Sequence, residues 1–409
     1  MTVRVKRYQP YDVFTASRDR IRMVFDHFER IYCAFSGGKD STVMAHLVMA
    51  EAIRRNRQVG LMFIDFEAQY KDSIENVQAV FDLYKDNIDP HWICVPMLLR
   101  NAVTNYEPRW ICWEPAKEGI WVRPKPTGPY IRTESDYPFC LPNMEFEEFV
   151  PLFGEWYSKG QPCAGFIGIR AGESLHRYCA VATWDKVGLM FNNQRWTTKK
   201  SEHAYNAYPI YDWQTEDIWR FHARYPELPY NHIYDKMQMA GVPFGDQRLC
   251  QPYGDDQRKG LWLFHILEPD TWFKVVARVN GANSGALYIQ ETGDINGYNK
   301  ITKPDNHTWK SFCNLLLQTM PRKTRDHYIY RFRKFIYGWQ QRGYQTIPEE
   351  APPELEAKCW APSWRRMCKV LLRNDYWCKG LGQTQPKSDA YLKYKELMKQ
   401  ANHAIQDTA

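Results

Sequence analysis

The sequence lacks long hydrophobic runs and closely spaced cysteine pairs. Its mean hydropathy is -0.60, and apolar segments such as Val59 to Ile64 are far shorter than the ~18 residues of a membrane-spanning helix. The eleven cysteines are dispersed, and none forms a C-x-x-C pair, which argues against a disulfide framework. The N-terminal segment has basic residues but no apolar core or cleavage signal. We therefore expect a cytoplasmic protein that does not associate with membranes.

The length and the charge distribution indicate more than one domain. At ~100–200 residues per domain, 409 residues predict two or three domains. Residues 301–409 carry a net charge of +9, which leaves -2 for residues 1–300 out of the total of +7. We predict a nucleotide-binding α/β domain over residues 1–245 and a basic, aromatic-rich, mostly helical domain over residues 246–409.

The N-terminal half alternates between strand-like and helix-like patterns. Apolar strands are predicted at residues 31–35, 59–64 and 92–95, and amphipathic helices precede or separate them. Strands return at residues 164–170 and 207–210, and Thr215 is the predicted N-cap of a further helix. This alternation predicts a parallel, twisted sheet with helices on both faces.

Two later regions have distinctive compositions. Residues 98–142 contain seven prolines and no periodic pattern, so we expect an inserted loop that contacts a substrate or a partner. A helix rich in basic and aromatic residues is predicted from residue 325 to residue 341. The basic residues of this segment form either a polyanion-binding surface or a solvated face that covers an aromatic core. The residues concerned are Arg322, Lys323, Arg325, Arg331, Arg333, Lys334 and Arg342, with Tyr328, Tyr330, Tyr337 and Trp339.

The sharpest motif is Ser36-Gly37-Gly38-Lys39-Asp40-Ser41, at a predicted strand-to-helix junction. Its glycines allow the backbone to approach an anion closely, and the free N–H groups of a helix N-terminus favour negative charge. The spacing differs from a Walker A loop, which needs a glycine five residues before a Gly-Lys pair. The motif therefore predicts a pyrophosphate-binding loop of another type.

This motif resembles the PP-loop of the N-type ATP pyrophosphatases. Residues 168–174, 208–219 and 228–235 are similar to the phosphoadenosine phosphosulfate (PAPS) reductase-like branch of that superfamily, and the resemblance covers roughly residues 25–250. Residues 248–254, 278–283 and 374–382 resemble the IbrA-like subgroup more narrowly. The resemblance implies an adenine nucleotide alpha hydrolase-like fold, with ATP across the carboxyl ends of the parallel strands.

The resemblance also implies roles for the loop residues. Lys39 would neutralise charge as the α–β phosphate bond breaks, and Asp40 is the candidate Mg²⁺ ligand. The residues implied to hold phosphate or its Mg²⁺ are Ser36, Gly37, Gly38, Asp40, Ser41 and Thr42. Asp65 and Glu67 follow the second predicted strand, where carboxylates bind ribose or a metal, or alternatively cap the next helix.

A second group of candidates follows the predicted strand at residues 164–170. Arg170 is the candidate phosphate clamp, and Glu173 its orienting carboxylate, with a purely structural ion pair as the alternative. His176 is a candidate general acid, or an exposed bystander, and Arg177 is a second clamp.

The cysteines depart from the resembled family. Its sulfonucleotide reductases use a Glu-Cys-Gly-x-His motif, and here the nearest similar segment is Cys378-Lys-Gly380. The spacings between Cys359, Cys368 and Cys378 suit no compact metal site, so we expect no iron–sulfur cluster. The resemblance places Cys250 where relatives have a functional loop cysteine, and a buried or incidental thiol is the favoured interpretation.

The sequence thus predicts an enzyme that uses ATP and Mg²⁺, cleaves the α–β bond and transfers adenylate to an acceptor, in sulfur metabolism or nucleic-acid modification. One alternative is a PAPS or adenylyl sulfate reductase. Another is a nucleotide-sensing regulator that acts on DNA with a ParB-like partner, a partner that the resemblance to IbrA-like proteins implies. Residues 301–409 are the candidate nucleic-acid-binding region.

Overall fold

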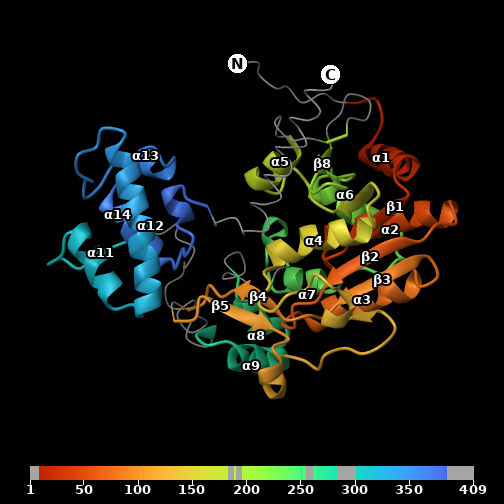
Figure 1. Ribbon diagram of the computed structural model, residues 1–409, viewed down its shortest axis with the longest axis horizontal. Helices are drawn as coiled ribbons and strands as arrows, with labels where there is room; N and C mark the ends of the chain where they lie inside the picture. Colours follow the sequence, from red (N-terminus) through yellow and green to blue (C-terminus); the bar gives the residue numbers. More distant parts are fainter. Residues whose placement is uncertain are drawn as a thin grey trace. The chain divides into compact units, whose positions relative to one another are not determined.

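The computed structural model describes residues 9–104, 106–182, 188–189, 196–249, 251–254, 261–282 and 301–384. These residues separate into two compact units, which are treated individually below (Figure 1). The first contains the described residues up to 97 and from 124 to 249, and the second contains residues 98–123 with those described after 250. The division after residue 249 lies four residues beyond the end of the predicted first domain at residue 245.

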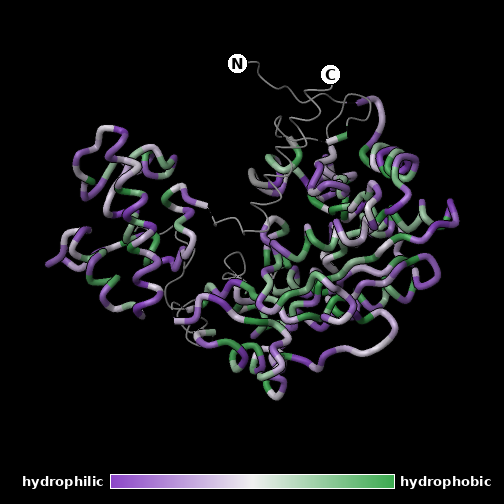
Figure 2. Tube along the Cα trace, viewed as in Figure 1, coloured by the Kyte–Doolittle hydropathy of each residue, from purple (hydrophilic) through white to green (hydrophobic). Residues whose placement is uncertain are grey.

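The first unit is built on a seven-stranded sheet in the order β6-β3-β2-β1-β7-β9-β8. Six strands are parallel to their neighbours, and β8 runs antiparallel to β9 at one edge. Hydrophobic residues are prominent along the central strands (Figure 2), and all six residues of β2 are buried. The strands are β1 (Arg30–Ala34), β2 (Val59–Ile64), β3 (Ile88–Ile93), β6 (Ile131–Arg132), β7 (Cys163–Ile167), β8 (Thr197–Lys199) and β9 (Ala204–Ala207).

Helices pack on both faces of this sheet. The connections through α2 and α3 lead from β1 towards the β6 edge of the sheet, whereas the connection through α4 leads back past β1 to β7. Because such crossovers are right-handed, α4 lies on the face of the sheet opposite to α2 and α3. Figure 1 shows α4 lying over that face of the strands. The helices are α1 (Val13–His27), α2 (Lys39–Arg54), α3 (Lys71–Leu83), α4 (Phe146–Ser158), α5 (Leu175–Ala182), α6 (Thr215–Arg224) and α7 (Ile233–Met239).

Tyr32 of β1 explains how α4 fits against the sheet. The Tyr32 ring contacts Phe153 and Tyr157 of α4 edge-on, at centroid distances of 5.4 and 5.7 Å. It lies over the neighbouring strands, where a Cβ atom on Gly165 would come within 2.3 Å of the ring and one on Gly60 within 2.9 Å of Tyr32 Cβ. Gly165 therefore makes room for the Tyr32 ring, and Gly60 makes room for the Tyr157 phenol, which a Cβ there would approach to 2.7 Å.

The proline-rich stretch from residue 98 to residue 142 differs from the single loop that the sequence suggested. It contains β5 (Arg109–Cys112), η1 (Pro115–Ile120), β6 and η2 (Glu134–Asp136), and β5 pairs with β4 (Met97–Arg100) in a separate two-stranded sheet. Residues 98–123 belong to the second unit and residues 124–142 to the first. Short strands and 3-10 turns tolerate proline better than long helices do, so the lost periodicity concealed them.

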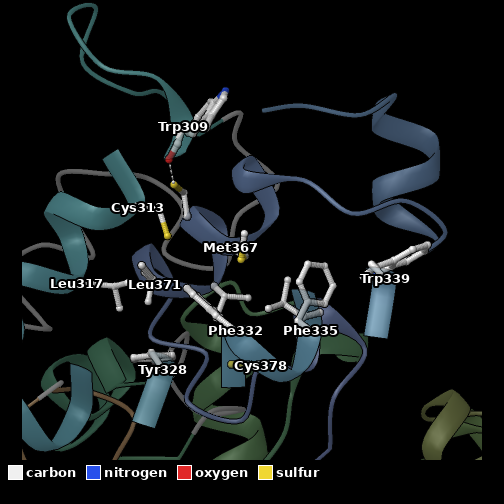
Figure 3. Packing of buried hydrophobic residues seen from close by; sticks show 13 residues of the cluster. Trp309, Cys313, Leu317, Tyr328, Phe332, Phe335, Trp339, Met367, Leu371 and Cys378 are labelled. Atoms are coloured by element: carbon white, nitrogen blue, oxygen red, sulfur yellow. Dashed lines mark hydrogen bonds between the residues drawn. The ribbon is translucent and has the colours of Figure 1, made fainter. Parts of the chain in front are cut away.

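The second unit is mostly helical after residue 260. The helices α11, α12 and α14 enclose a core that includes Cys313, Tyr328, Phe332, Phe335 and Met367 (Figure 3). The elements are α8 (Leu261–Leu267), α9 (Pro269–Arg278), α11 (Trp309–Gln318), α12 (Arg322–Gln340), α13 (Pro353–Ala357), α14 (Trp364–Leu372) and η4 (Lys379–Leu381), and η3 (Phe244–Asp246) belongs to the first unit.

The structure confirms the predicted α/β fold with a mostly parallel sheet and a helical C-terminal region. Several local predictions were wrong: the strands expected at residues 164–170 and 92–95 end at Ile167 and Ile93. Gln214, not Thr215, caps α6, because Gln214 and Asp217 form a reciprocal capping box. The last parallel strand ends at Ala207, where residues 207–210 had been expected as strand. Arg331, grouped with the surface cations of α12, is buried, and its guanidinium donates to the Trp377 and Thr384 carbonyls.

Candidate nucleotide-binding site

The loop from Ser36 to Thr42 joins β1 to α2 at the carboxyl edge of the sheet. Gly37 has a φ of +73°, and a Cβ there would lie 3.0 Å from Val77 Cγ2, so both conformation and space require glycine. Gly38 is the N-cap residue of α2, with a φ of -81°, and no side chain caps this end of the helix. The first turn of α2 therefore presents its backbone donors without an internal cap.

Side chains from distant segments hold the loop. Asn231 Nδ2 donates to the Gly37 carbonyl at 2.9 Å, and Asn76 Nδ2 donates to the same oxygen at 3.3 Å. The Lys39 backbone N–H donates to the Tyr234 hydroxyl at 3.2 Å. These three side chains were not among the predicted site residues, although Asn231 and Tyr234 belong to the family-like segment 228–235. They fix the loop in the shape that its glycines permit.

The hydroxyl groups of the loop point back onto it. Ser36 Oγ lies 2.9 Å from Ser41 Oγ, and Thr42 Oγ1 donates to the Gly38 carbonyl at 2.9 Å. Among the residues that the structure describes, the N–H groups of Gly37, Gly38, Asp40 and Ser41 have no hydrogen-bond partner. Four backbone donors are therefore left without a partner at a helix N-terminus, where the helix dipole is positive and phosphate oxygens are favoured.

A buried chain of alternating charges adjoins this turn. Lys39 Nζ donates to the Gln247 carbonyl at 3.1 Å and lies 3.4 Å from Asp40 Oδ2. The other carboxylate oxygen of Asp40 accepts a hydrogen bond from Arg170 Nε. The exposed fractions of Lys39, Asp40 and Arg170 are 5%, 9% and 5%. The structure thus brings together three residues that the sequence placed at this site from two segments 130 positions apart.

Arg170 reaches α2 because the end of β7 passes close to it. A Cβ on Gly168 would lie only 3.0 Å from Ser41 Cα, so the absent side chain allows the two backbones to approach. On its far side, Arg170 Nη2 lies 3.8 Å from Glu173 Oε1, and Glu173 also accepts from Arg177. His176 belongs to α5, and its side chain lies outside the described part of the structure.

Asp65 and Glu67 lie at the same edge of the sheet, after β2, but both are almost fully buried. Asp65 accepts hydrogen bonds from Trp92 Nε1 at 2.9 Å and from the Glu67 backbone N–H at 3.0 Å. The N-cap residue of α3 is Tyr70, so neither carboxylate caps that helix, which was the alternative interpretation. Asp65 instead ties the end of β2 to β3.

Asp40 does not present an open metal site in this arrangement. Its carboxylate faces the cationic groups of Arg170 and Lys39, which a Mg²⁺ ion would have to displace. Within the described ranges, no group of three or more His, Cys, Asp or Glu side chains is arranged to hold a metal ion. The residues present therefore do not fit Mg²⁺ held by Asp40.

Two buried histidines lie in contacting helices, His46 in α2 and His222 in α6. His46 Nδ1 lies 2.7 Å from the Tyr84 hydroxyl, and Nε2 lies 2.8 Å from the Pro229 carbonyl. Burial lowers the pKa of His46 to about 4, although the Pro229 carbonyl opposes this shift. Burial, with a smaller contribution from His46, also lowers the pKa of His222 to about 4. Both rings are therefore neutral at pH 7.

Several buried thiols of the described residues are held in the protonated form. Burial raises the pKa values of Cys163 and Cys378 to about 12, and a hydrogen bond with Cys368, together with burial, raises that of Cys313. A thiol with a raised pKa is a poor nucleophile. Cys250 lies outside the described residues.

A pocket of about 270 Å³ lies elsewhere, between α1, α2 and α6. Its floor includes Ile21, Leu47 and Phe221, and its lining contains no residue of the 36–42 loop. The lining of this cavity is thus distinct from the loop with the unpartnered backbone donors. No described helix is both long and apolar enough to cross a membrane.

Comparison with known proteins identifies one relative along nearly the whole chain. The uncharacterized protein YbdN of Escherichia coli (strain K12) is 40% identical over 394 residues, covering 95% of each chain. A family model described as a domain of unknown function, DUF3440, matches residues 241–361.

Two solved structures have weaker likenesses. PAPS reductase from Candida auris, in a phosphate complex, has a TM-score of 0.28 and 13% identity, and the match covers 54% of this chain and 84% of that one. The U34-tRNA thiolase NcsA from Methanococcus maripaludis, with its 4Fe-4S cluster, has a TM-score of 0.29 and 13% identity, and the match covers 71% of this chain and 86% of that one.

Proposed function

The chain belongs to the family of Escherichia coli YbdN, and we propose that it is an ATP-dependent enzyme of the PP-loop type. In the proposed reaction, an acceptor oxygen attacks the α-phosphorus of ATP, the α–β bridging bond breaks, and pyrophosphate leaves. The acceptor, which carries the adenylate, is proposed to belong to sulfur metabolism or nucleic-acid modification. The observation that carries this proposal is the uncapped N-terminus of α2, where four backbone N–H groups lack a partner among the described residues and the buried Arg170 bonds to Asp40 of the first turn.

The backbone donors would bind phosphate oxygens, because N–H groups fixed by a fold need no reorganisation when an anion arrives. Lys39 would contribute charge where pyrophosphate leaves. Arg170 would contact the phosphate chain from the β7 side, with Asp40 and Glu173 positioning its guanidinium. Arg177 is proposed as the outer cation, because its side chain is 42% exposed and pairs with Glu173.

The other predicted residues take lesser parts in this proposal. Ser36, Ser41 and Thr42 shape the loop through their hydroxyl groups, and Asp65 and Glu67 border the site from β2. His176 is retained as a proposed general acid. Mg²⁺ that accompanies ATP supplies charge neutralisation on the phosphates, and no step here depends on a metal held by Asp40.

Two alternatives receive less support. A sulfonucleotide reductase needs a nucleophilic thiol, and the shifts resolved for the described cysteines raise their pKa values. A nucleotide-sensing regulator with a ParB-like partner would use the same loop for binding without turnover. Product analysis distinguishes these alternatives from the proposed enzyme, because only the proposed enzyme would release pyrophosphate from ATP.

The decisive experiment incubates the full chain with ATP labelled at the α-phosphate and Mg²⁺, with and without nucleic acid, and identifies the products. AMP or an adenylated acceptor, with pyrophosphate, is expected. Lys39→Ala should abolish their formation, whereas Lys71→Ala, at a side chain that is 79% exposed, should not. ADP as the product would refute cleavage at the α–β bond, and tight binding without turnover would favour the regulator.

A further inference from the structure

The long helix α12 of the second unit has two contrasting faces. One face packs into the core through Tyr328, Phe332, Phe335 and Trp339, whose side chains lie among those of α11 and α14 (Figure 3). Hydrophobic and hydrophilic residues accordingly alternate along this helix (Figure 2). The opposite face is therefore directed away from the core of its unit.

That opposite face carries two exposed tyrosines and two exposed cations. Tyr330 is 56% exposed and Tyr337 is 64% exposed, and Arg333 and Lys334 between them are also exposed. Their spacing of three, four and seven residues places all four on one side of the helix. We call these residues, Tyr330, Arg333, Lys334 and Tyr337, the tyrosine face. At ~1.5 Å per residue, its two rings are about 10 Å apart along the axis.

The surroundings of this face are positively charged. Lys334 Nζ lies over the Tyr330 ring, 4.5 Å from its centroid, so one face of this ring contacts a cation. Asp326 is the single acidic residue of α12, and it lies 3.8 Å from both Arg322 and Arg325. The region after residue 300 carries a net charge of +9. An uncompensated basic surface attracts polyanions.

We propose that the tyrosine face binds single-stranded nucleic acid, with unpaired bases stacked on Tyr330 and Tyr337 and phosphates contacting Arg333 and Lys334. Aromatic rings interleaved with cations match a strand that offers bases and phosphates alternately. Duplex nucleic acid would leave the rings unused, because its bases are already stacked on one another. An acidic protein would use the cations but has no need of two exposed rings. This proposal is independent of the ATP site.

The test measures the affinity of the full chain for fluorescein-labelled oligothymidylate and oligouridylate of about 20 nucleotides by fluorescence anisotropy. Tyr330→Ala and Tyr337→Ala should each weaken binding by about 5- to 150-fold, as expected for one lost stacking contact. Tyr330→Phe and Tyr337→Phe should bind like the natural chain, because phenylalanine keeps the ring. Tyr106→Ala, at a side chain that is 72% exposed elsewhere in the same unit, is the matched control and should leave affinity unchanged.

The salt dependence tests the cations separately. Replacing Arg333 and Lys334 with Gln should make the slope of log K against log salt concentration shallower by about 1.4, because two phosphate contacts are lost. Lys85→Gln, at an exposed position of the first unit, should not alter the slope. A preference for one oligonucleotide over the other would identify the strand as DNA or RNA within the same proposal.

Two binding results would overturn the proposal: no binding at 50 mM salt, where phosphate contacts are strong, or natural affinity in a folded variant that carries both Tyr330→Ala and Tyr337→Ala. Tighter binding of duplex than of single strands would also overturn it. Equally tight binding of polyglutamate would assign the surface to an acidic protein instead. ATP affinity serves as an internal reference and should be the same in every variant.

Discussion

Removal of the Arg170 guanidinium should destabilise the first unit because it takes one of two cationic neighbours from the buried Asp40 carboxylate and one of two from Glu173. The Arg170 side chain is 5% exposed and that of Asp40 is 12% exposed. In Arg170→Met, Lys39, at 3.4 Å, is the one ion-pair partner that Asp40 keeps among the described residues. Loss of one partner from a buried ion pair typically costs about 3–5 kcal/mol, so a decrease of that size in unfolding free energy is expected.

A double-mutant cycle separates this interaction from the rest of the site. Asp40→Asn removes the carboxylate charge and leaves Arg170 beside Glu173. If the Asp40–Arg170 contact is energetically important, the double variant should lose less stability than the sum of the two single variants. The coupling energy expected for two directly bonded side chains is about 1–3 kcal/mol.

Native-state hydrogen exchange of α2 measures this effect in the full chain, since it reports the opening free energy of that segment. The control is Arg220→Met, which removes a surface ion pair with Asp217 at 3.3 Å from an arginine that is 78% exposed. That change should cost at most about 1 kcal/mol. Strict additivity in the cycle, or an Arg170→Met effect no larger than the control, would refute the interpretation of a buried charge chain.

Three further predictions concern the same unit and the thiols. Gly37→Ala should lower unfolding free energy by about 1–2 kcal/mol, because φ is +73° there; equal stability in urea denaturation would contradict this. Since the folded pKa values of His46 and His222 lie near 4, below an unfolded value of about 6.5, their stabilising contribution is complete above pH 6.5 and is lost as pH falls towards 4. A stability profile that is flat across that window would be inconsistent with two neutral buried rings. Cys378, whose pKa is raised to about 12, should react with maleimide far more slowly in the native chain than in denaturant, and rapid native labelling at this residue would revive the reductase alternative.

The alternation of apolar strands and amphipathic helices predicted most of the first unit. β1 and β2 are buried on both faces, so hydrophobicity in sequence was sufficient to locate them. The boundaries near Ala207 and Gln214 were less predictable because a capping box and a strand end depend on local hydrogen bonds. The burial of Arg331 could not be predicted from periodicity alone. It depends on the backbone carbonyls of Trp377 and Thr384, which accept hydrogen bonds from the guanidinium and offset the cost of removing its charge from water.

The candidate site was predictable in part. The motif from Ser36 to Ser41 identified the helix N-terminus, because glycine, hydroxyl and charge coincide there. Asn76 and Asn231 carry no such signal: each contacts the Gly37 carbonyl from a distant segment. Their role depends on the packing of α3 and of the chain before α7 against the loop, which one sequence does not specify.

The most direct test of the central claim is calorimetric titration of the full chain and of Gly38→Val with ATP. Gly38 has φ -81° and ψ 161°, a conformation that valine adopts. The Cβ atom of a valine at this position would lie 3.3 Å from the Tyr234 hydroxyl and 3.5 Å from Ser36 Oγ. The valine methyl groups would then cover the loop donors, and loss of even one charge-assisted hydrogen bond should weaken binding by about 10- to 150-fold. Gly245→Val, at a position with nothing within 4 Å, should bind ATP as the natural chain does. Unchanged ATP affinity in a folded Gly38→Val variant would contradict phosphate binding at this loop.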